Sequence, residues 1–197
     1  KNDQLQTELK FLKSQYHPHF LFNALNTVYF QIDESNKAPR RTLEMISELL
    51  RYQLYGGNQK VSILQEIDYL KTYIALRKLR MSERLRLRVE FPPELNELNI
   101  YPLLFLPLVE NAFKYVGGDY QLDIIMKWEN NRISLFIRNS IPELSAEDEA
   151  LRKSVDKRQR KGIGLVNLRR RLSLLYPNKH RLETRKEETE FVAELMI

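Results

Sequence analysis

The sequence predicts an α+β protein in which a helical hairpin, residues 1–82, precedes a two-layer α/β sandwich, residues 83–197. In the first part, apolar residues recur at steps of three and four, which is the helical period. From about residue 84 they alternate with charged residues, as in a half-buried strand. Strands and helices then follow one another in the mixed order that is typical of a two-layer sandwich.

Three segments of the first part have helical spacing, at residues 5–30, 43–54 and 62–81. Asn36 and Pro39, between the first two, suit a turn between helices. Ser62 followed by Gln65 forms a capping-box signature at the start of the third. Antiparallel helices of this kind expose an apolar stripe, which a second hairpin would bury in a four-helix dimer. An ordinary bundle stalk has the same pattern, so these helices alone do not assign a function.

The second part should form two central strands, residues 121–128 and 132–139, joined by a short turn. An earlier strand is expected at residues 85–91 and a closing hairpin at residues 181–197. Helical spacing covers two further segments, residues 102–116 and 165–176.

The 197 residues are 43% hydrophobic and 29% charged, which is the composition of a globular protein with a substantial core. The chain has no cysteine, so disulfides and thiolate metal sites are excluded, and three scattered histidines do not suggest a metal cluster. Much of the net charge of +6 comes from local clusters, which suit phosphate contacts better than a nucleic-acid surface. No apolar run is long enough to span a bilayer. Because the sequence begins with Lys1 rather than methionine, we expect a fragment of a longer protein.

The stretch SQYHPHFLFNALNTV, residues 14–28, places polar residues inside an apolar helical pattern. Pro18 lacks a backbone N–H and is expected to kink the helix. His19 follows it directly, and Asn23 lies one turn later on the same face. A polar centre in an apolar seam indicates a reaction zone, in which the kink presents His19 and Asn23 orients its ring.

The stretch PLLFLPLVENAFKYV, residues 102–116, carries Glu110, Asn111 and Lys114 on an otherwise apolar helix. Asn111 and Lys114 are three residues apart, so they share a face that could line a cavity. An amide oxygen suits Mg²⁺, and a lysine one turn away suits the charge of a phosphate. In the alternative interpretation, Asn111 bonds neighbouring backbone and Lys114 is a solvated surface residue.

In RKGIGLVNLRRRLSLLY, residues 160–176, Gly162 and Gly164 come immediately before a predicted helix. Glycine lets backbone approach a ligand closely and a helix N-terminus offers free N–H groups, which together favour phosphate binding. An ordinary turn would also use these glycines. Asn167 and the arginines 169–171 follow, and at least one arginine can reach back toward the turn.

Residues 140–161 form a long polar stretch that is acidic first and basic later, without an apolar period. Beside a phosphate site such a loop suits a lid, since long loops without secondary structure tend to be functional or disordered. A charged insertion with no role has the same composition, so both interpretations fit.

Three stretches, QYHPHFLFNALNTV, LPLVENAFKY and GIGLVNLRRRL, together resemble the motifs of the LytS/YehU-type sensor histidine kinases. The resemblance runs from Ser14 to Ile197, with the motifs in the family's order. It implies a homodimeric hairpin that carries the phosphoacceptor, followed by an ATP-binding domain of the GHKL type. The implied function is that of a two-component sensor kinase, which transfers the γ-phosphoryl group of ATP to a histidine and then to an aspartate in a response regulator's receiver domain.

Residue by residue, the resemblance implies that His19 is the phosphoacceptor and that Asn111 is the Mg²⁺ ligand. His17 is taken as incidental, residues 140–161 as the ATP lid, and Asn23 and Glu110 as catalytic residues. Contacts to ATP are expected from a larger set: Asn111, Lys114, Tyr115, Asn139, Gly162, Gly164, Asn167 and Arg171. The full-length protein is expected to be anchored upstream in a bacterial inner membrane, with this part in the cytoplasm.

The sequence departs from the family's pattern after residue 138. GHKL domains carry Asp-x-Gly-x-Gly there, and the aspartate accepts a hydrogen bond from the adenine amine; this chain has Asn139 in IRNSIPELS, without glycine. Bonds to charged groups are worth roughly 1.5–3 kcal/mol against about 1 kcal/mol for neutral ones, so weaker ATP binding is expected. Leu106 also replaces a usual glutamine, and Tyr115-Val116 a frequent His-Gly.

The alternative function is a catalytically weak or inactive dimeric signalling module with a degenerate nucleotide pocket. The missing glycines support it, whereas His19, Asn111 and the glycine turn favour an active kinase. A nucleic-acid-binding function rests only on basic clusters. It is disfavoured by the 26 acidic residues and by the lack of interleaved aromatic and basic residues.

Overall fold

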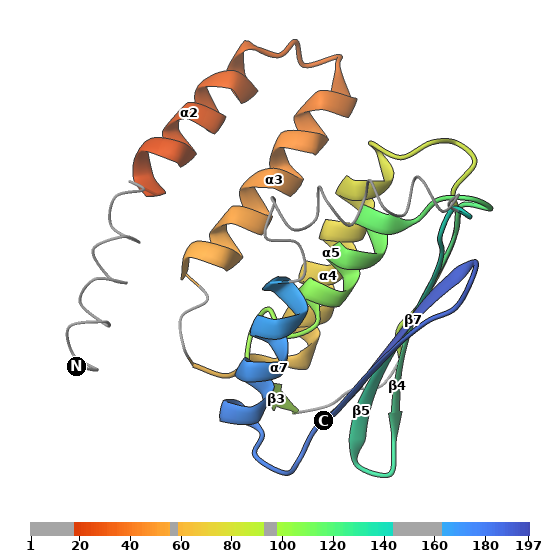
Figure 1. Ribbon diagram of the computed structural model, residues 1–197. Helices are drawn as coiled ribbons and strands as arrows, with labels where there is room; N and C mark the ends of the chain where they lie inside the picture. Colours follow the sequence, from red (N-terminus) through yellow and green to blue (C-terminus); the bar gives the residue numbers. More distant parts are fainter. Residues whose placement is uncertain (1–17, 56–58, 93–97, 144–162) are drawn as a thin grey trace. The chain divides into compact units, whose positions relative to one another are not determined.

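The computed structural model describes residues 18–55, 59–92, 98–143 and 163–197. The chain divides into two compact units, residues 1–57 and 58–197. The first contains a helical hairpin, and the second contains a layer of helices against a five-stranded sheet (Figure 1). The predicted α+β fold, a helical hairpin followed by a two-layer α/β sandwich, is confirmed.

The boundary between the compact units lies before helix α4, Ile63–Lys78, and therefore earlier than the predicted division at residue 82. Helix α4 contacts strand β1 and helix α5 of the second unit. Its apolar residues Ile63, Ile67, Leu70 and Ile74 are buried there. The predicted domain division at residue 82 stays a prediction.

Two helices of the first unit, α2 (Pro18–Gln31) and α3 (Lys37–Tyr55), form the hairpin. Arg40 fastens the turn by donating to the carbonyl oxygen of Ile32 at 2.9 Å. Helix α2 has no buried residue, and α3 buries Leu49. Apolar side chains of this unit therefore remain exposed.

The sheet of the second unit has the order β2–β4–β5–β7–β6. Strand β2 is parallel to β4, and the other neighbouring pairs are antiparallel. Asn130 and Asn131 close the β4–β5 hairpin with φ values of 51° and 60°, a conformation that asparagine tolerates. The predicted strands are confirmed at Arg86–Glu90 (β2), Gln121–Glu129 (β4), Arg132–Ser140 (β5), Arg181–Lys186 (β6) and Glu190–Met196 (β7).

A second, two-stranded sheet leads into helix α4. Strand β1 (Val61–Ser62) pairs antiparallel with β3 (Asn99–Ile100). The Gln65 backbone N–H donates to the Ser62 hydroxyl at 3.2 Å, and the Ser62 N–H donates to Gln65 Oε1 at 3.0 Å. The predicted capping box is confirmed.

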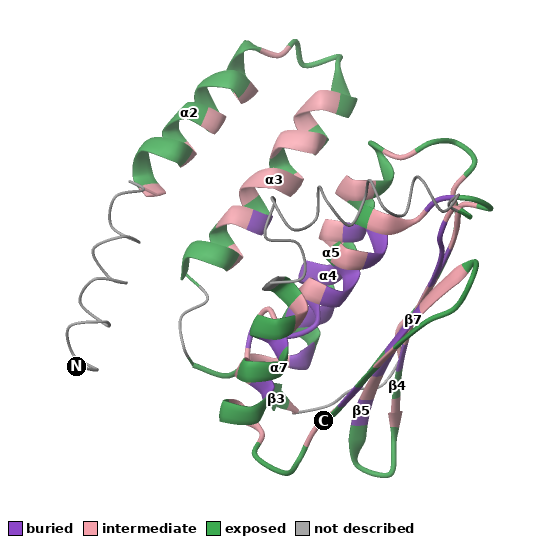
Figure 2. Cartoon of the chain, viewed as in Figure 1, coloured by how far each residue is buried: buried purple, intermediate pink, exposed green. Residues whose placement is uncertain are grey.

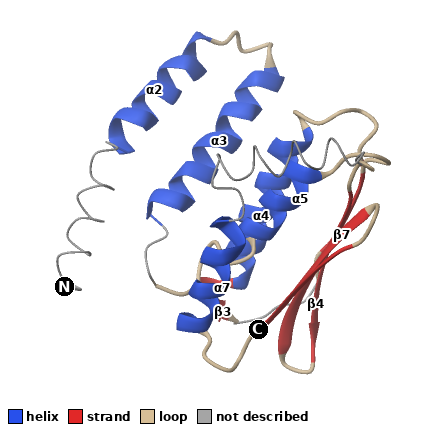
Figure 3. Cartoon of the chain, in the orientation of Figure 1, coloured by secondary structure: helices blue, strands red, loops and turns tan. Residues whose placement is uncertain are grey.

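Helices α4, α5 (Leu106–Tyr115) and α7 (Ile163–Leu175) lie on one side of the large sheet (Figures 1 and 3). Alternate residues of the central strands point into this layer and are buried, as the burial colours in Figure 2 show. The buried set comprises Leu122, Ile124, Met126, Ile133, Leu135, Ile137 and Leu195. None of the described helices has the length and apolar composition needed to cross a bilayer.

Helix α5 begins at Leu106 rather than at residue 102, because the preceding segment is held in a different conformation. Leu103 has φ 55°, in the left-handed region that a non-glycine residue rarely adopts. The carboxylate of Glu66, which has no exposed area, accepts the N–H of Leu103 at 2.9 Å and that of Leu104 at 3.0 Å. Glu66 on α4 therefore determines where α5 starts.

Replacing Glu66 with alanine should lower the free energy of unfolding by about 3 kcal/mol, because two backbone N–H groups would lose a charged acceptor and one of them is fully buried. Urea denaturation followed by circular dichroism measures this loss. Asp68→Ala on the same helix is the matched control, since its carboxylate is 70% exposed and lies 3.9 Å from Lys71. The control should cost less than about 0.5 kcal/mol, and an equal loss in both variants would contradict the role given to Glu66.

Candidate functional site

The predicted phosphoacceptor, His19, lies in the first turn of α2 and is exposed. Asn23, one turn later, donates from Nδ2 to His19 Nδ1 at 3.1 Å. The prediction that these side chains share a helix face is confirmed. Pro18 has helical conformation, and the segment before it, including His17, lies outside the described residues, so the kink stays a prediction.

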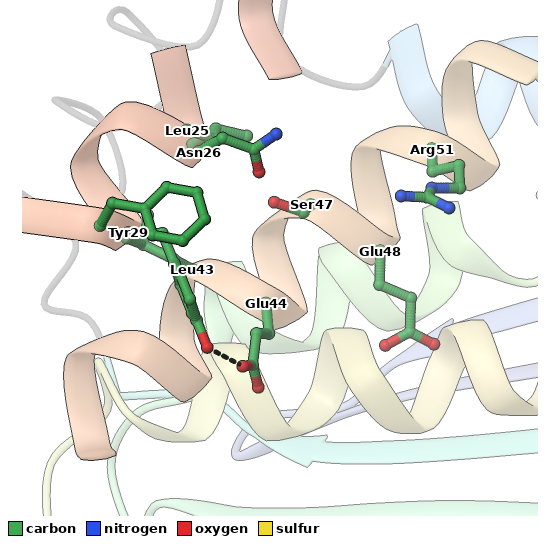
Figure 4. Close-up of a pocket in the computed structure, with 9 residues that line it drawn as sticks. Leu25, Asn26, Tyr29, Leu43, Glu44, Ser47, Glu48 and Arg51 are labelled. Atoms are coloured by element: carbon green, nitrogen blue, oxygen red, sulfur yellow. Dashed lines mark hydrogen bonds between the residues drawn. The ribbon is translucent and has the colours of Figure 1, made fainter. Parts of the chain in front are cut away.

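A groove of about 400 Å³ lies between α2 and α3 in the first unit (Figure 4). The Tyr29 hydroxyl donates to Glu44 Oε1 at 2.9 Å across it, and this bond raises the pKa of Tyr29. Asn26 lines this groove and lies three residues after Asn23, on the same face of α2. The lining comprises Leu25, Asn26, Tyr29, Phe30, Leu43, Glu44, Ser47, Glu48 and Arg51.

Helix α5 separates a polar face from a buried one. Asn111 and Tyr115 are partly exposed and Lys114 is exposed, whereas Leu108, Val109, Ala112 and Phe113 are buried. The Lys114 ammonium lies 5.3 Å from the centre of the Tyr115 ring, a cation–π contact. These three side chains are therefore accessible, and their roles toward Mg²⁺ and phosphate stay predictions.

Glu110 precedes this face and is also exposed. Partial desolvation raises the pKa of its carboxyl, and the charge of Arg77 on α4 lowers it to a lesser extent. The Arg77 guanidinium lies 5.7 Å from the ring of Phe113, and its Nε is buried with no partner among the described residues. The environment of Glu110 is thus set by α4 as well as by α5.

Asn139 ends the inward-facing series of β5 and has no exposed area. Its Nδ2 donates to the carbonyl oxygen of Ser140 at 3.2 Å. Its Oδ1 is buried, and no described residue donates to it. A buried amide oxygen without a partner costs free energy, so a donor supplied by a ligand would fit this position.

Ser140 joins the end of β5 to the segment that follows α5. Its hydroxyl donates to the carbonyl oxygen of Gly117 at 2.6 Å, and the Gly117 N–H donates to the Ser140 carbonyl oxygen at 3.0 Å. A Cβ on Gly117 would lie 2.9 Å from Pro142 Cδ, and Gly118 has φ 60°, so both positions require glycine or a shift of their neighbours. These contacts bring Asn139 to the C-terminal end of α5.

Helix α7 brings the third group of predicted residues. Gly164 lies in its first turn, with no atom within 4 Å of an added Cβ, and Asn167 is exposed. Gly162 and residues 144–161 of the predicted lid lie outside the described residues. Arg171 donates to the carbonyl oxygens of Pro102 at 2.7 Å and Leu103 at 3.3 Å, so the structure places its charge on backbone of the segment before α5.

The residues of the second unit fit a nucleotide with Mg²⁺. The orphaned Asn139 oxygen can accept from an adenine amine, and the Asn111 amide oxygen is a hard ligand of the kind Mg²⁺ prefers. Helix α5 contacts both β5 and α7, which places the three sets of residues around one helix. His19 lies in the other compact unit and is described within that unit alone.

Three residues that shape this site were not among the predicted ones: Glu66, Arg77 and Gly117. A fourth, Ser140, was predicted as the start of the lid, and that is wrong because Ser140 is the last residue of strand β5. Glu66 had a detectable signal, since it lies beside Ile63, Ile67 and Leu70 in the apolar seam of a predicted helix. The pair Gly117–Gly118 is visible in the sequence as a turn. Nothing in the local sequence links Ser140 or Arg77 to α5, because their contacts are between distant segments.

Comparison with known proteins adds an independent finding. A family model described as histidine kinase matches residues 7–85. The sensor protein kinase HptS of Staphylococcus aureus strains USA300 and NCTC 8325 is 29% identical over 180 residues. This match covers 89% of the chain but 35% of HptS, so the chain spans about a third of the length of these relatives. Among solved structures, the Acinetobacter baumannii histidine kinase AdeS has a TM-score of 0.45 and 13% identity, covering 93% of this chain and 96% of AdeS.

The family model matches the part that contains His19, and the HptS match extends across nearly the whole chain. The resemblance to the LytS/YehU-type sensor histidine kinases, predicted from three sequence motifs, is confirmed.

Proposed function

We propose that the chain is the phosphoacceptor and ATP-binding part of a two-component sensor histidine kinase. It transfers the γ-phosphoryl group of ATP to His19 and then to an aspartate in the receiver domain of a response regulator. The observation that carries this proposal is the buried, unpartnered Oδ1 of Asn139, at the end of a strand fastened to α5. A buried acceptor of this kind is explained by a ligand that supplies the donor.

In this proposal the predicted nucleotide residues other than Arg171 have the following tasks. Asn139 accepts the hydrogen bond of the adenine amine, Asn111 offers its amide oxygen to Mg²⁺, and Lys114 with Tyr115 lies beside the phosphates. Gly162, Gly164 and Asn167 surround the phosphates at the start of α7. The nucleotide and its metal, when bound, supply the transferable phosphoryl group and neutralise its charge.

The transfer to His19 needs an imidazole nitrogen with a free lone pair. A bond forms between this nitrogen and the γ-phosphorus, and the bond from phosphorus to the leaving oxygen of ADP breaks. As this bond forms, the ring's N–H proton passes to a base, and the family resemblance makes Glu110 the candidate for that role. In the second transfer the nitrogen–phosphorus bond breaks and a bond to the receiver's carboxylate oxygen forms.

Asn23 selects which ring nitrogen is free. With its Nδ2 donating to Nδ1, the neutral ring carries its proton on Nε2. When the carboxamide turns over and presents Oδ1, Nδ1 carries the proton and the Nε2 lone pair becomes the nucleophile. We infer that this second arrangement is the reactive one.

A homodimer and a membrane-anchored sensor belong to the same proposal. Phe20 and Phe30 on α2 are 74% and 79% exposed, and a second hairpin would cover such side chains. The input region and the inner-membrane anchor would lie outside these 197 residues, with this part in the cytoplasm. Because the chain spans 35% of its curated relatives, the activity of the whole protein is part of the proposal.

The alternative proposal is a dimeric signalling module that binds ATP weakly or not at all. The observation that favours it is Asn139 itself, because a neutral amide is a weaker acceptor than a carboxylate. The first proposal expects ATP to phosphorylate His19, and the alternative expects little or no phosphorylation.

Incorporation of phosphate from γ-labelled Mg-ATP is the decisive measurement. Acid-labile label should appear in the unchanged chain and fall to background in His19→Ala, which has no acceptor nitrogen. Asn111→Ala should lose at least about a hundredfold in rate, because the metal would lose its protein ligand. Label that persists in His19→Ala would contradict the proposal, and absence of label together with absence of ATP binding would favour the signalling module.

Asn23 variants test the orientation of the ring. Asn23→Asp offers Nδ1–H an acceptor and should keep the initial rate of phosphorylation within about threefold, whereas Asn23→Leu should lose about tenfold or more. Thr27→Ala, one turn further on α2, is the control because the Thr27 hydroxyl donates to the Asn23 carbonyl oxygen rather than to the ring. Equal rates in Asn23→Asp and Asn23→Leu would exclude the orienting role.

Replacing Asn139 with valine tests the adenine contact. The affinity for ATP should fall about fivefold, the equivalent of one neutral hydrogen bond, while the affinity for inorganic triphosphate stays unchanged. The free energy of unfolding without nucleotide should change by less than about 1 kcal/mol, since the variant also removes an unpartnered buried oxygen. Calorimetric titration and urea denaturation measure the two quantities, and an equal loss for triphosphate would argue against an adenine contact.

A further inference from the structure

The segment before α5 is held from two sides at one residue. The N–H of Leu103 donates to Glu66 on α4 at 2.9 Å, and its carbonyl oxygen accepts from Arg171 on α7 at 3.3 Å. Arg171 also donates to the carbonyl oxygen of the preceding Pro102 at 2.7 Å. Because Leu103 has φ 55°, a conformation that costs about 1 kcal/mol for leucine, these bonds have to hold it in place.

Both partners of Leu103 are charged, and hydrogen bonds to charged groups are stronger than neutral ones. A further contact fastens the same segment to the C-terminal end of α7: the Tyr101 N–H donates to the Tyr176 hydroxyl at 3.3 Å, and the two rings meet edge to face at 5.8 Å. The entry into α5 is therefore tied to α4 and α7 at the same time.

Arg171 has its two terminal nitrogens on backbone carbonyl oxygens. It also lies one helical turn after Asn167, which we place beside the phosphates. These contacts account for the position of the Arg171 side chain without a ligand, although the family resemblance assigns Arg171 to the nucleotide. Arg170, the preceding residue, is exposed.

We propose that Arg171 is a positioning residue, which fixes α7 to the entry of α5 and so sets the separation of the two helices that hold the nucleotide, without touching the phosphates itself. This inference rests on the proposed nucleotide function. The buried carboxylate of Glu66 provides the opposing support on the other side of Leu103, so the two charged side chains act as one clamp.

The number of phosphates on the ligand distinguishes positioning from direct contact. Calorimetric affinities for AMP, ADP and ATP should all fall by the same factor, about fivefold, in Arg171→Gln, because each nucleotide needs the two helices at the same separation. A phosphate contact would instead give a loss that grows from AMP to ATP and falls with added salt. Arg170→Gln removes the same charge from the same helix and should leave all three affinities unchanged.

A second pair of variants separates positioning from general loss of stability. Arg171→Lys keeps the charge but cannot span both carbonyl oxygens with a planar fork, so it should restore less than half of the lost affinity. Glu66→Gln weakens the opposite side of the clamp, and the losses in Glu66→Gln and Arg171→Gln should not add in the double variant. Affinities are compared at a temperature at which urea denaturation finds every variant folded.

The inference is overturned if the loss rises more than threefold from AMP to ATP, if Arg171→Lys recovers full affinity, or if folded Arg171→Gln binds all three nucleotides as the unchanged chain does. An unchanged chain that binds none of them overturns the proposed function and this inference together. Binding by the unchanged chain with an equal loss across the three nucleotides supports both.

Discussion

A single buried carboxylate organises the second unit. Glu66 has no contact with solvent, and burying an ionised side chain is costly unless hydrogen bonds replace its water. The two N–H groups before α5 provide such bonds, and they also force Leu103 into the left-handed region. The position at which α5 begins, and hence the face that Asn111 presents, depends on this interaction with a different helix, together with the bonds of Arg171 on α7.

The candidate site is built from polar groups that the surrounding packing leaves without partners or only partly covered. The Asn139 amide oxygen lies at the end of a strand whose other inward residues are apolar and well packed. Ser140, its neighbour, is fully used in holding Gly117 and Gln121. The unpartnered amide oxygen of Asn139 lowers the stability of the free protein. A ligand that supplies the missing donor would restore that stability.

The first unit has the opposite character. Its helices bury little within the hairpin, and its polar seam of His19, Asn23 and Asn26 lies beside exposed aromatic side chains. A short hairpin cannot build a core of its own, so its stability depends on what covers the apolar stripe. In the proposed kinase, the seam on α2 would have to stay accessible while the apolar side chains of the same hairpin are covered.

Local patterns in the sequence determined the helices and strands, the capping box at Ser62, the asparagine turn between β4 and β5, and the helix faces that carry His19–Asn23 and Asn111–Lys114. These features depend on the period of the chain and on neighbours three or four residues apart, so one stretch of sequence contains them. Contacts between distant segments could not be read in the same way. The start of α5 at Leu106, the bonds of Ser140 to Gly117, the unpartnered oxygen of Asn139 and the attachment of Arg171 to backbone were decided only by the tertiary structure. The physical reason is that a buried polar group is satisfied by whichever donor or acceptor the packing brings near it, and that partner is set by the arrangement of whole elements rather than by adjacent residues.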